Sequence, residues 1–256
     1  KPTRLNIVEL GPGDGSLAKV LIKTFEKFPQ FNKALKIFLY EKSIYLKKLQ
    51  KKNIKSKKVK WIHNFKDIRK GPIIFFGNEF FDAIPIKQFS RKKNSLYEKY
   101  FVLNKNDKVI EAYKKASFKD EIEINNLNTL KNLKFIEFPK LGLNELNKMI
   151  QKVIKLSGGI LLIDYGYLKP KNISSIQSVL KHKKNNLFNN LGKADITSLV
   201  NFSLLEEYFK KQNLKVKKIV SQKFFLERMG IIARANILSK KMSFNEQSNL
   251  YLRMKR

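Results

Sequence analysis

The residues whose types and spacing most clearly suggest chemistry form a glycine-rich segment near the start of the chain. An apolar run ends at Glu9, and glycines follow at every second position, at Gly11, Gly13 and Gly15. Glycines allow positive φ angles and let a ligand approach the main chain closely. The free N–H groups at the start of the next helix favour a polar or charged ligand. The pattern predicts a strand, a tight turn and a helix at a binding site, although Gly-Pro-Gly also occurs in ordinary turns.

A second group of polar residues follows another apolar run, at 72–77. Asn78, Glu79 and Asp82 place an amide and two carboxylates among apolar residues. Buried polar groups need partners, which indicates a ligand or a hydrogen-bond network. Glu79 and Asp82 are three positions apart, a spacing that puts both on one face of a helical turn. Asp82 could equally be a helix-start residue that binds backbone N–H groups.

Three more expected strands end in residues that could contact a ligand. Glu41 ends the second strand, where an acid in a βαβ unit can accept both hydroxyls of a ribose. Glu41 could instead be a helix-start residue, because a helix is expected to follow it. Asn64 and Phe65 follow the third strand; Phe65 could face an adenine ring or pack on the core. Asp164 and Tyr165 follow the fifth strand, where Asp164 could line the same cleft or only finish the strand.

These candidates require an α/β architecture in which strand ends meet at one edge of a sheet. Apolar runs predict five sheet strands, at 5–10, 35–41, 59–63, 72–77 and 160–163. Helical periodicity predicts helices at 16–28, 43–52, 143–156 and 204–212. We expect a Rossmann-like, mostly parallel sheet with a terminal antiparallel strand pair, at 216–220 and 231–238.

The segment 87–138 predicts a small β-rich insertion between the fourth and fifth strands, because short alternating runs are separated by a turn. Within it, 120–132 is polar and expected to be irregular. We expect the core domain to comprise 1–86 and 139–239, and 240–256 to be a polar tail.

Composition excludes several classes of site. The 256 residues include no cysteine, so disulfides and thiolate metal sites are absent, and only His63 and His182 offer imidazole. We expect no metal. No apolar run approaches the roughly 20 residues that span a bilayer, so we expect no membrane insertion.

The formal charge of +33 raises the possibility of nucleic-acid binding. Only seven of the 54 basic residues are arginine, the residue best suited to phosphate and base contacts. Lysines are spread along the whole chain, which favours a compositional bias at solvated positions. We expect weak, salt-sensitive adhesion to polyanions and no specific nucleic acid.

Four segments together resemble, in order, the MidA family of class I S-adenosylmethionine-dependent methyltransferases, which contains the mitochondrial complex I assembly factor 7 methyltransferases. They are Glu9-Leu10-Gly11-Pro12-Gly13 with Gly15, Asn78-Glu79-Phe80-Phe81-Asp82-Ala83-Ile84-Pro85, Ile163-Asp164-Tyr165-Gly166, and Asp195-Ile196-Thr197 with Phe202. Asp14 stands where members usually carry arginine. The chain starts with Lys1 rather than Met and lacks the family's upstream Gly-Asp-Phe-x-Thr region, so we expect an N-terminal part to be missing here.

The resemblance implies S-adenosylmethionine as cofactor and, in the mitochondrial relatives, a protein arginine as substrate. Carried over by position, Glu9 and the three glycines meet the methionine end, and Glu41 meets the ribose. Asn64, Phe65 and Asn78 complete the cofactor candidates. Glu79 is the first catalytic candidate and Asp82 the second. Phe81, Asp164 and Tyr165 are candidates for substrate contact.

The expected partner is a protein, such as a respiratory-complex subunit. The expected compartment is the cytoplasm of a bacterium or the mitochondrial matrix of a eukaryote. Two alternatives stay open: a non-catalytic assembly protein that keeps the fold, and a nucleic-acid methyltransferase. The latter lacks an Asn-Pro-Pro-Tyr-type loop after the fourth strand. Neither the target nor an oligomeric state follows from the sequence.

Overall fold

The computed structural model of the protein describes residues 3–93, 95–181 and 183–255, so His182 lies outside the described residues. The chain forms two compact units, Lys1–Lys215 and Val216–Arg256. Within the described residues, no helix is long and apolar enough to cross a membrane.

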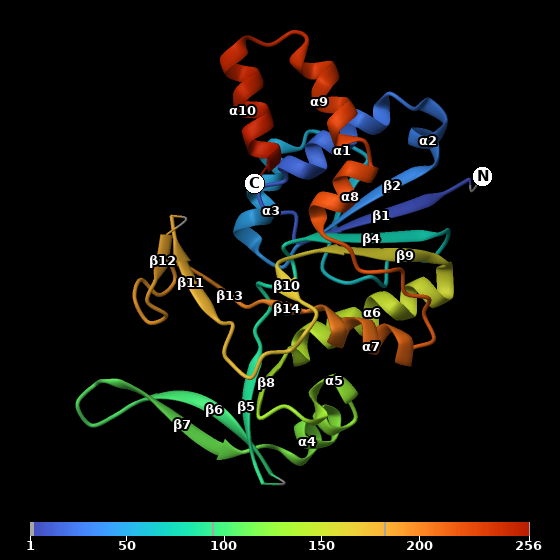
Figure 1. The fold of residues 1–256 in the computed structure, drawn as a ribbon. Coiled ribbons are helices and arrows are strands. Elements are labelled where there is room, and N and C mark those ends of the chain that lie inside the picture. The colour runs from blue at the N-terminus through green and yellow to red at the C-terminus, as the bar shows by residue number, and fades with distance from the viewer. Residues whose placement is uncertain (1–2, 94, 182, 256) are drawn as a thin grey trace. The chain divides into compact units, whose positions relative to one another are not determined.

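A five-stranded parallel sheet is the centre of the first unit (Figure 1). Its strands are β1 (Leu5–Leu10), β2 (Leu35–Tyr40), β3 (Val59–Ile62), β4 (Ile73–Asn78) and β9 (Gly158–Ile163). They lie in the order β3-β2-β1-β4-β9, with Ile7 opposite Ile37 on one side and Ile74 on the other. All five strands are parallel, so their carboxyl ends share one edge. The predicted mostly parallel α/β sheet is confirmed.

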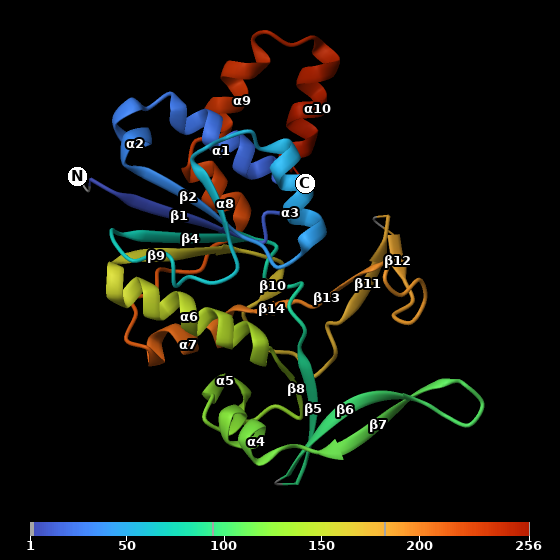
Figure 2. The ribbon, with the colours of Figure 1, turned by 180° about the vertical axis from the view of Figure 1, so that it is seen from behind.

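Helices cover both faces of the sheet (Figure 2). Successive side chains of a strand point to opposite faces. Ile7 therefore packs with Ala18 and Ile22 of α1 (Ser16–Glu26) in one core cluster. Val8 belongs to the other cluster, which includes residues of the helices α6 (Lys140–Leu156) and α7 (Phe202–Lys211). Helices α2 (Pro29–Ala34) and α3 (Ile44–Asn53) flank β2 in the chain.

The β-rich insertion is present between β4 and β9 as an antiparallel sheet in the order β7-β6-β5-β8. Its strands are β5 (Lys87–Lys92), β6 (Ser95–Leu103), β7 (Val109–Lys115) and β8 (Phe135–Phe138). The expectation of an irregular 120–132 is wrong, because helices α4 (Phe118–Asn125) and α5 (Asn128–Lys131) occupy it. Ser117 caps α4 by accepting a hydrogen bond from the Asp120 N–H at 3.1 Å, and Ile124 is fully buried.

Two smaller sheets complete the first unit. Strands β11 (Gln177–Leu180), β12 (Lys183–Asn185) and β13 (Asp195–Thr197) form an antiparallel sheet. Strands β10 (Gly166–Tyr167) and β14 (Val200–Asn201) pair in parallel just before α7.

The expected terminal strand pair is wrong. Residues 216–221 are in no helix or strand, and the second unit contains α8 (Gln222–Arg228), α9 (Ile231–Ser239) and α10 (Phe244–Lys255). Gly230 adopts a left-handed conformation (φ 87°) and starts α9. A short apolar run does not distinguish strand from helix, and two alanines in α9 favour the helix. The segment expected as a polar tail contains α10.

Candidate active site

The glycine-rich segment forms the expected turn between β1 and α1. Gly11, Gly13 and Gly15 all have positive φ angles, of 58°, 54° and 84°. The Gly15 N–H donates to the carbonyl of Pro12 at 2.8 Å, which closes the turn directly before α1. A side chain added at Gly13 would meet no protein atom within 4 Å, so this part of the loop borders open space.

Phe80 connects this turn to the segment after β4. A Cβ at Gly11 would lie 3.0 Å from a ring carbon of Phe80, closer than side chains normally approach. Gly77, the penultimate residue of β4, has its own close contact, because a Cβ there would lie 3.1 Å from the Cβ of Phe80. Phe80 is not among the site residues predicted from the sequence. The feature of the sequence that could have indicated Phe80 is the pair of glycines, Gly11 and Gly77, that leave space for its side chain.

Glu9 is a buried carboxylate with an unsatisfied oxygen. The residue is 4% exposed, and its Oε2 has no hydrogen-bond partner. Burial raises the pKa of Glu9 to about 7. An unpaired carboxyl beside the glycine turn fits a site for a cationic or hydrogen-bond-donating ligand.

Glu41 lies beside the same turn, directly after β2. Its Oε1 accepts from the Ser43 N–H at 2.7 Å and its Oε2 from the Gln50 side chain at 3.0 Å. The same Gln50 Nε2 donates to the Gly13 carbonyl at 2.8 Å. Gln50, which sequence reasoning missed, therefore joins Glu41 to the glycine turn. Gln50 is the buried residue of α3.

The two candidates after β3 differ in their surroundings. Asn64 is exposed, and its Oδ1 accepts from the Lys66 N–H at 2.9 Å. Phe65 is 4% exposed. Its ring centroid lies 4.7 Å from that of Tyr40 and 4.9 Å from that of Phe75. The structure therefore favours the core-packing alternative for Phe65.

The segment after β4 brings two carboxylates close together without forming a helix. Asn78 and Glu79 are exposed, and Glu79 has a left-handed backbone (φ 51°) fixed by its N–H donating to the Ile163 carbonyl at 2.9 Å. The expected helical turn is absent, because this backbone breaks it. Asp82 has a buried Oδ1 without a hydrogen-bond partner. Burial raises the pKa of Asp82, and the negative charge of Glu79 also raises it, against a backbone hydrogen bond from Ala83 that lowers it.

Asp164 holds this segment in place. Its Oδ2 accepts hydrogen bonds from the consecutive N–H groups of Phe80, Phe81 and Asp82, at 3.2, 2.9 and 3.3 Å. Its Oδ1 accepts from the Tyr165 N–H at 2.8 Å. Burial and the nearby Asp82 charge raise the pKa of Asp164 to about 6. The observed contacts of Asp164 are therefore structural ones that shape the loop.

The two remaining candidates for substrate contact differ strongly in exposure. Phe81 is 4% exposed and packs on α6, where a Cβ at Gly142 would lie 3.2 Å from its ring. Tyr165 is 62% exposed at the carboxyl end of β9. Tyr165 is thus free to contact a partner, whereas the buried Phe81 packs between its loop and α6.

The carboxyl edge of the parallel sheet concentrates acidic groups in a strongly basic chain. The five acids Glu9, Glu41, Glu79, Asp82 and Asp164 all lie at or just after a strand end. This edge can bind a ligand that carries positive charge. Within the described residues, no group of three or more His, Cys, Asp or Glu side chains could hold a metal ion.

Several named proteins are similar to this chain in sequence. A protein arginine methyltransferase NDUFAF7 homolog of Caenorhabditis elegans is 26% identical over 246 residues, which cover 88% of this chain and 57% of that protein. The protein arginine methyltransferase NDUFAF7 of Danio rerio is 24% identical, with 97% and 63% covered. The human protein of that name is 24% identical, with 93% and 59% covered. The chain therefore spans less than two thirds of the length of these relatives.

Solved structures share the fold. A native crystal structure of a protein from Burkholderia thailandensis superposes with a TM-score of 0.78 at 18% identity, covering 96% of this chain and 68% of that one. A second structure from the same organism, in complex with S-adenosyl-homocysteine, gives a TM-score of 0.76 at 18% identity, covering 96% and 66%. Residues 1–220 match the model of the family described as "Putative S-adenosyl-L-methionine-dependent methyltransferase". The chain belongs to this S-adenosyl-L-methionine-dependent methyltransferase family.

Proposed function

We propose that this chain carries the methyl-transfer site of an S-adenosylmethionine-dependent methyltransferase whose substrate is an arginine side chain of a protein. The observation that carries the proposal is the pair Glu79 and Asp82, two neighbouring carboxylates at the sheet edge beside the glycine turn. The names of the relatives, protein arginine methyltransferase, support the same substrate.

The residues around the glycine turn fit S-adenosylmethionine. Glu9 offers an unpaired carboxyl to the cationic amino group at the methionine end. The glycine turn leaves open space at Gly13 for close approach. Glu41, fixed by Ser43 and Gln50, can accept the ribose hydroxyls with its remaining lone pairs. When bound, the cofactor supplies an electrophilic methyl group on its sulfonium.

The residues after β4 fit the acceptor. A guanidinium is always charged in proteins, and its fork of N–H donors matches a carboxylate. Glu79 and Asp82 can fix the group by charge-assisted hydrogen bonds and draw its charge away from the reacting nitrogen. In-line transfer requires reacting atoms about 3–3.5 Å apart, so positioning is the main contribution of the protein.

The names of the relatives also support a partner and a compartment. Three relatives carry mitochondrial in their names, which favours the matrix for a eukaryotic member and the cytoplasm for a bacterial one. A protein substrate such as a respiratory-complex subunit is part of the proposal.

The replacement Glu79→Gln tests the acceptor role. We expect it to abolish arginine methylation of the natural target, detected by mass spectrometry, while calorimetric binding of S-adenosylmethionine stays within about twofold. Glu26→Gln, an exposed acid on α1, is the matched control and should change neither quantity. Loss of both methylation and binding in Glu79→Gln would assign Glu79 to the cofactor instead. A wild-type protein that binds its partner but transfers no methyl group would favour the non-catalytic assembly protein.

A further inference from the structure

Gln50 has a fully buried side chain whose amide contacts three separate segments. Its Nε2 donates to the Gly13 carbonyl at 2.8 Å and to Glu41 Oε2 at 3.0 Å. On the other side of the amide, the indole N–H of Trp61 donates to Gln50 Oε1 at 3.0 Å. A glutamine amide has two N–H donors and one carbonyl acceptor, so both donors are in use and the acceptor has a partner.

The three partners permit only one orientation of this amide. Gly13 and Glu41 each present an oxygen acceptor, whereas Trp61 presents a donor. Rotation of the amide by half a turn would place its oxygen against two acceptors and its nitrogen against a donor. Trp61 belongs to β3, where it lies opposite Leu39 of β2, so the central sheet holds the indole in place. The amide of Gln50 is therefore fixed in both position and orientation.

The same end of α3 contacts the rest of the glycine turn. Asn53 lies three positions after Gln50 on one face of the helix, and its Nδ2 donates to the Asp14 carbonyl at 2.9 Å. Ile54 follows α3 directly, and a Cβ at Gly15 would lie 2.8 Å from its side chain. The end of α3 thus supports the turn from residue 13 to residue 15.

Glu41 depends on neutral donors for its position. It is buried, and in the part of the chain that the structure describes it forms no ion pair with a lysine or arginine. Its Oε1 accepts from the Ser43 N–H at 2.7 Å, and its Oε2 accepts from Gln50. Hydrogen bonds to an ionised carboxylate are stronger than those between neutral groups. Loss of the Gln50 donor would therefore release Oε2 and let the carboxylate turn.

We infer that Gln50, oriented by Trp61, is a positioning residue that couples the ribose contact of the cofactor to its methionine contact. The inference rests on the proposed function, which assigns Glu41 to the ribose hydroxyls and the glycine turn to the methionine end. Both contacts share one fixed amide, so the ribose hydroxyls contribute to affinity only while Gln50 holds Glu41 beside the turn. Gln50 thereby determines the preference of the site for a ligand with an intact ribose.

The test compares S-adenosyl-homocysteine with its dideoxyribose analogue, which lacks both ribose hydroxyls, by calorimetric titration of the full chain. We expect the wild type to bind the analogue at least about tenfold more weakly, because two hydroxyls lose a charged acceptor. Gln50→Met keeps the length of the side chain but removes both donors. This variant should bind S-adenosyl-homocysteine at least about tenfold more weakly than the wild type and prefer it to the analogue by less than about threefold.

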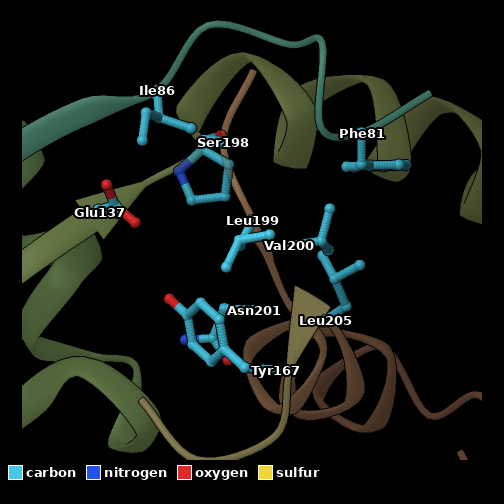
Figure 3. A pocket seen from close by; sticks show the side chains of 10 residues that line it. Phe81, Ile86, Glu137, Tyr167, Ser198, Leu199, Val200, Asn201 and Leu205 are labelled. Carbon is cyan, nitrogen blue, oxygen red and sulfur yellow. The ribbon is translucent and has the colours of Figure 1, made fainter. Parts of the chain in front are cut away.

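Gln88→Met is the matched control, because Gln88 is also a buried glutamine that donates to a buried carboxylate. Its Nε2 donates to Glu137 Oε1 at 2.9 Å and to the Ser174 hydroxyl at 2.7 Å. Glu137 belongs to the insertion sheet and lines a small cavity together with Tyr167 (Figure 3). Gln88→Met thus removes an equivalent donor from another part of the chain, and it should leave both affinities unchanged.

If Gln50→Met does not fold, Trp61→Phe takes its place, because phenylalanine keeps an aromatic ring but lacks the indole N–H. It should reduce the preference for the intact ribose at least about threefold. An unchanged preference in either variant would overturn the inference, and equal weakening of both ligands by Gln50→Met would mean a merely structural role for Gln50.

The wild type distinguishes failure of this inference from failure of the proposed function. A wild type that prefers the intact ribose, beside a Gln50→Met variant with the same preference, would overturn the inference alone. Equal affinities of the wild type for the two ligands would overturn its premise, the ribose contact of Glu41. No binding of either ligand by the folded wild type would overturn the inference together with the proposed cofactor site.

Discussion

At the scale of single residues, Glu9 shows the sharpest conflict between burial and charge. The sequence places it before the first glycine, and the resemblance suggests a contact with the cofactor. Only the structure shows that its Oε2 is buried without a partner. A buried unpaired carboxyl destabilises the free protein and favours a ligand that supplies the missing partner.

Replacing Glu9 by Gln should change how the stability of the ligand-free protein depends on pH. Burial raises the pKa of Glu9 from 4.5 to about 7, so between these values the folded chain holds a proton that the unfolded chain releases. The stability associated with Glu9 is therefore complete below pH about 4.5 and is lost as the pH rises through about 7. Above that pH, Glu9→Gln should be more stable than the wild type by up to about 3 kcal/mol. Urea unfolding at pH 5 and pH 8 measures this difference, and equal pH slopes for both proteins would contradict it.

Other residues illustrate the limits of sequence reasoning at this scale. The position of Phe65 after β3 allowed both a ligand contact and core packing, and its neighbours Tyr40 and Phe75 decide for packing. Gln50 carried no recognisable pattern, because its importance arises from a hydrogen bond to Gly13, far away in the chain. Phe80 belongs to a recognisable segment, but its contact with Gly11 depends on how the two segments pack. Residue types and their spacing can identify a candidate side chain, but the contacts of that side chain depend on how distant segments pack.

At the scale of elements, the five parallel strands could be predicted because buried strands form apolar runs bounded by polar turns. Five of the predicted strand starts or ends moved, each by one or two residues, as in β9, which starts at Gly158 rather than 160. The terminal strand pair could not be predicted correctly, because the run Ile231–Ser239 suits a helix as well as a strand. Helix α4 was missed because its contacts, such as the ion pair of Asp120 with Lys87 of β5, join residues far apart in the chain.

The loop after β4 depends on one carboxylate from another strand, and this dependence can be tested. Asp164→Ala removes the acceptor of three consecutive N–H groups and should destabilise the protein by about 1–3 kcal/mol. Hydrogen exchange of the amides of Phe80, Phe81 and Asp82 should become faster. Asp195→Ala, at the exposed start of β13, is the control and should leave these amides unchanged. Unchanged exchange in Asp164→Ala would contradict a role for Asp164 in fixing the loop.

At the scale of the whole molecule, the candidate site is acidic although the chain as a whole is strongly basic. The chain carries +33, yet the carboxyl edge of its central sheet gathers five acids. The net charge alone raised the possibility of a polyanion partner, which the scarcity of arginine made us discount, and the strand order places the acids together and favours a cationic substrate. The sequence could not show this contrast, because the acids are up to 155 positions apart, from Glu9 to Asp164, and only the sheet brings them to one edge.

The basic charge should produce only weak adhesion to nucleic acids. We expect binding to a labelled DNA duplex at low salt to fall steeply with salt and to vanish by about 200 mM, equally for unrelated sequences. Fluorescence anisotropy across a salt series measures this dependence. Binding that persists at about 200 mM and differs between sequences would support the nucleic-acid methyltransferase instead.

The central claim is that the glycine turn between β1 and α1 binds S-adenosylmethionine. Calorimetric titration of the chain with S-adenosylmethionine tests it most directly, beside the variants Gly13→Val and Gly192→Val. Both glycines have positive φ angles, 54° and 77°, and a Cβ at either would meet no atom within 4 Å, so the two changes impose a similar backbone strain. We predict micromolar binding by the wild type and by Gly192→Val, and none by Gly13→Val. Equal binding by all three proteins, or no binding by the folded wild-type chain, would contradict the account.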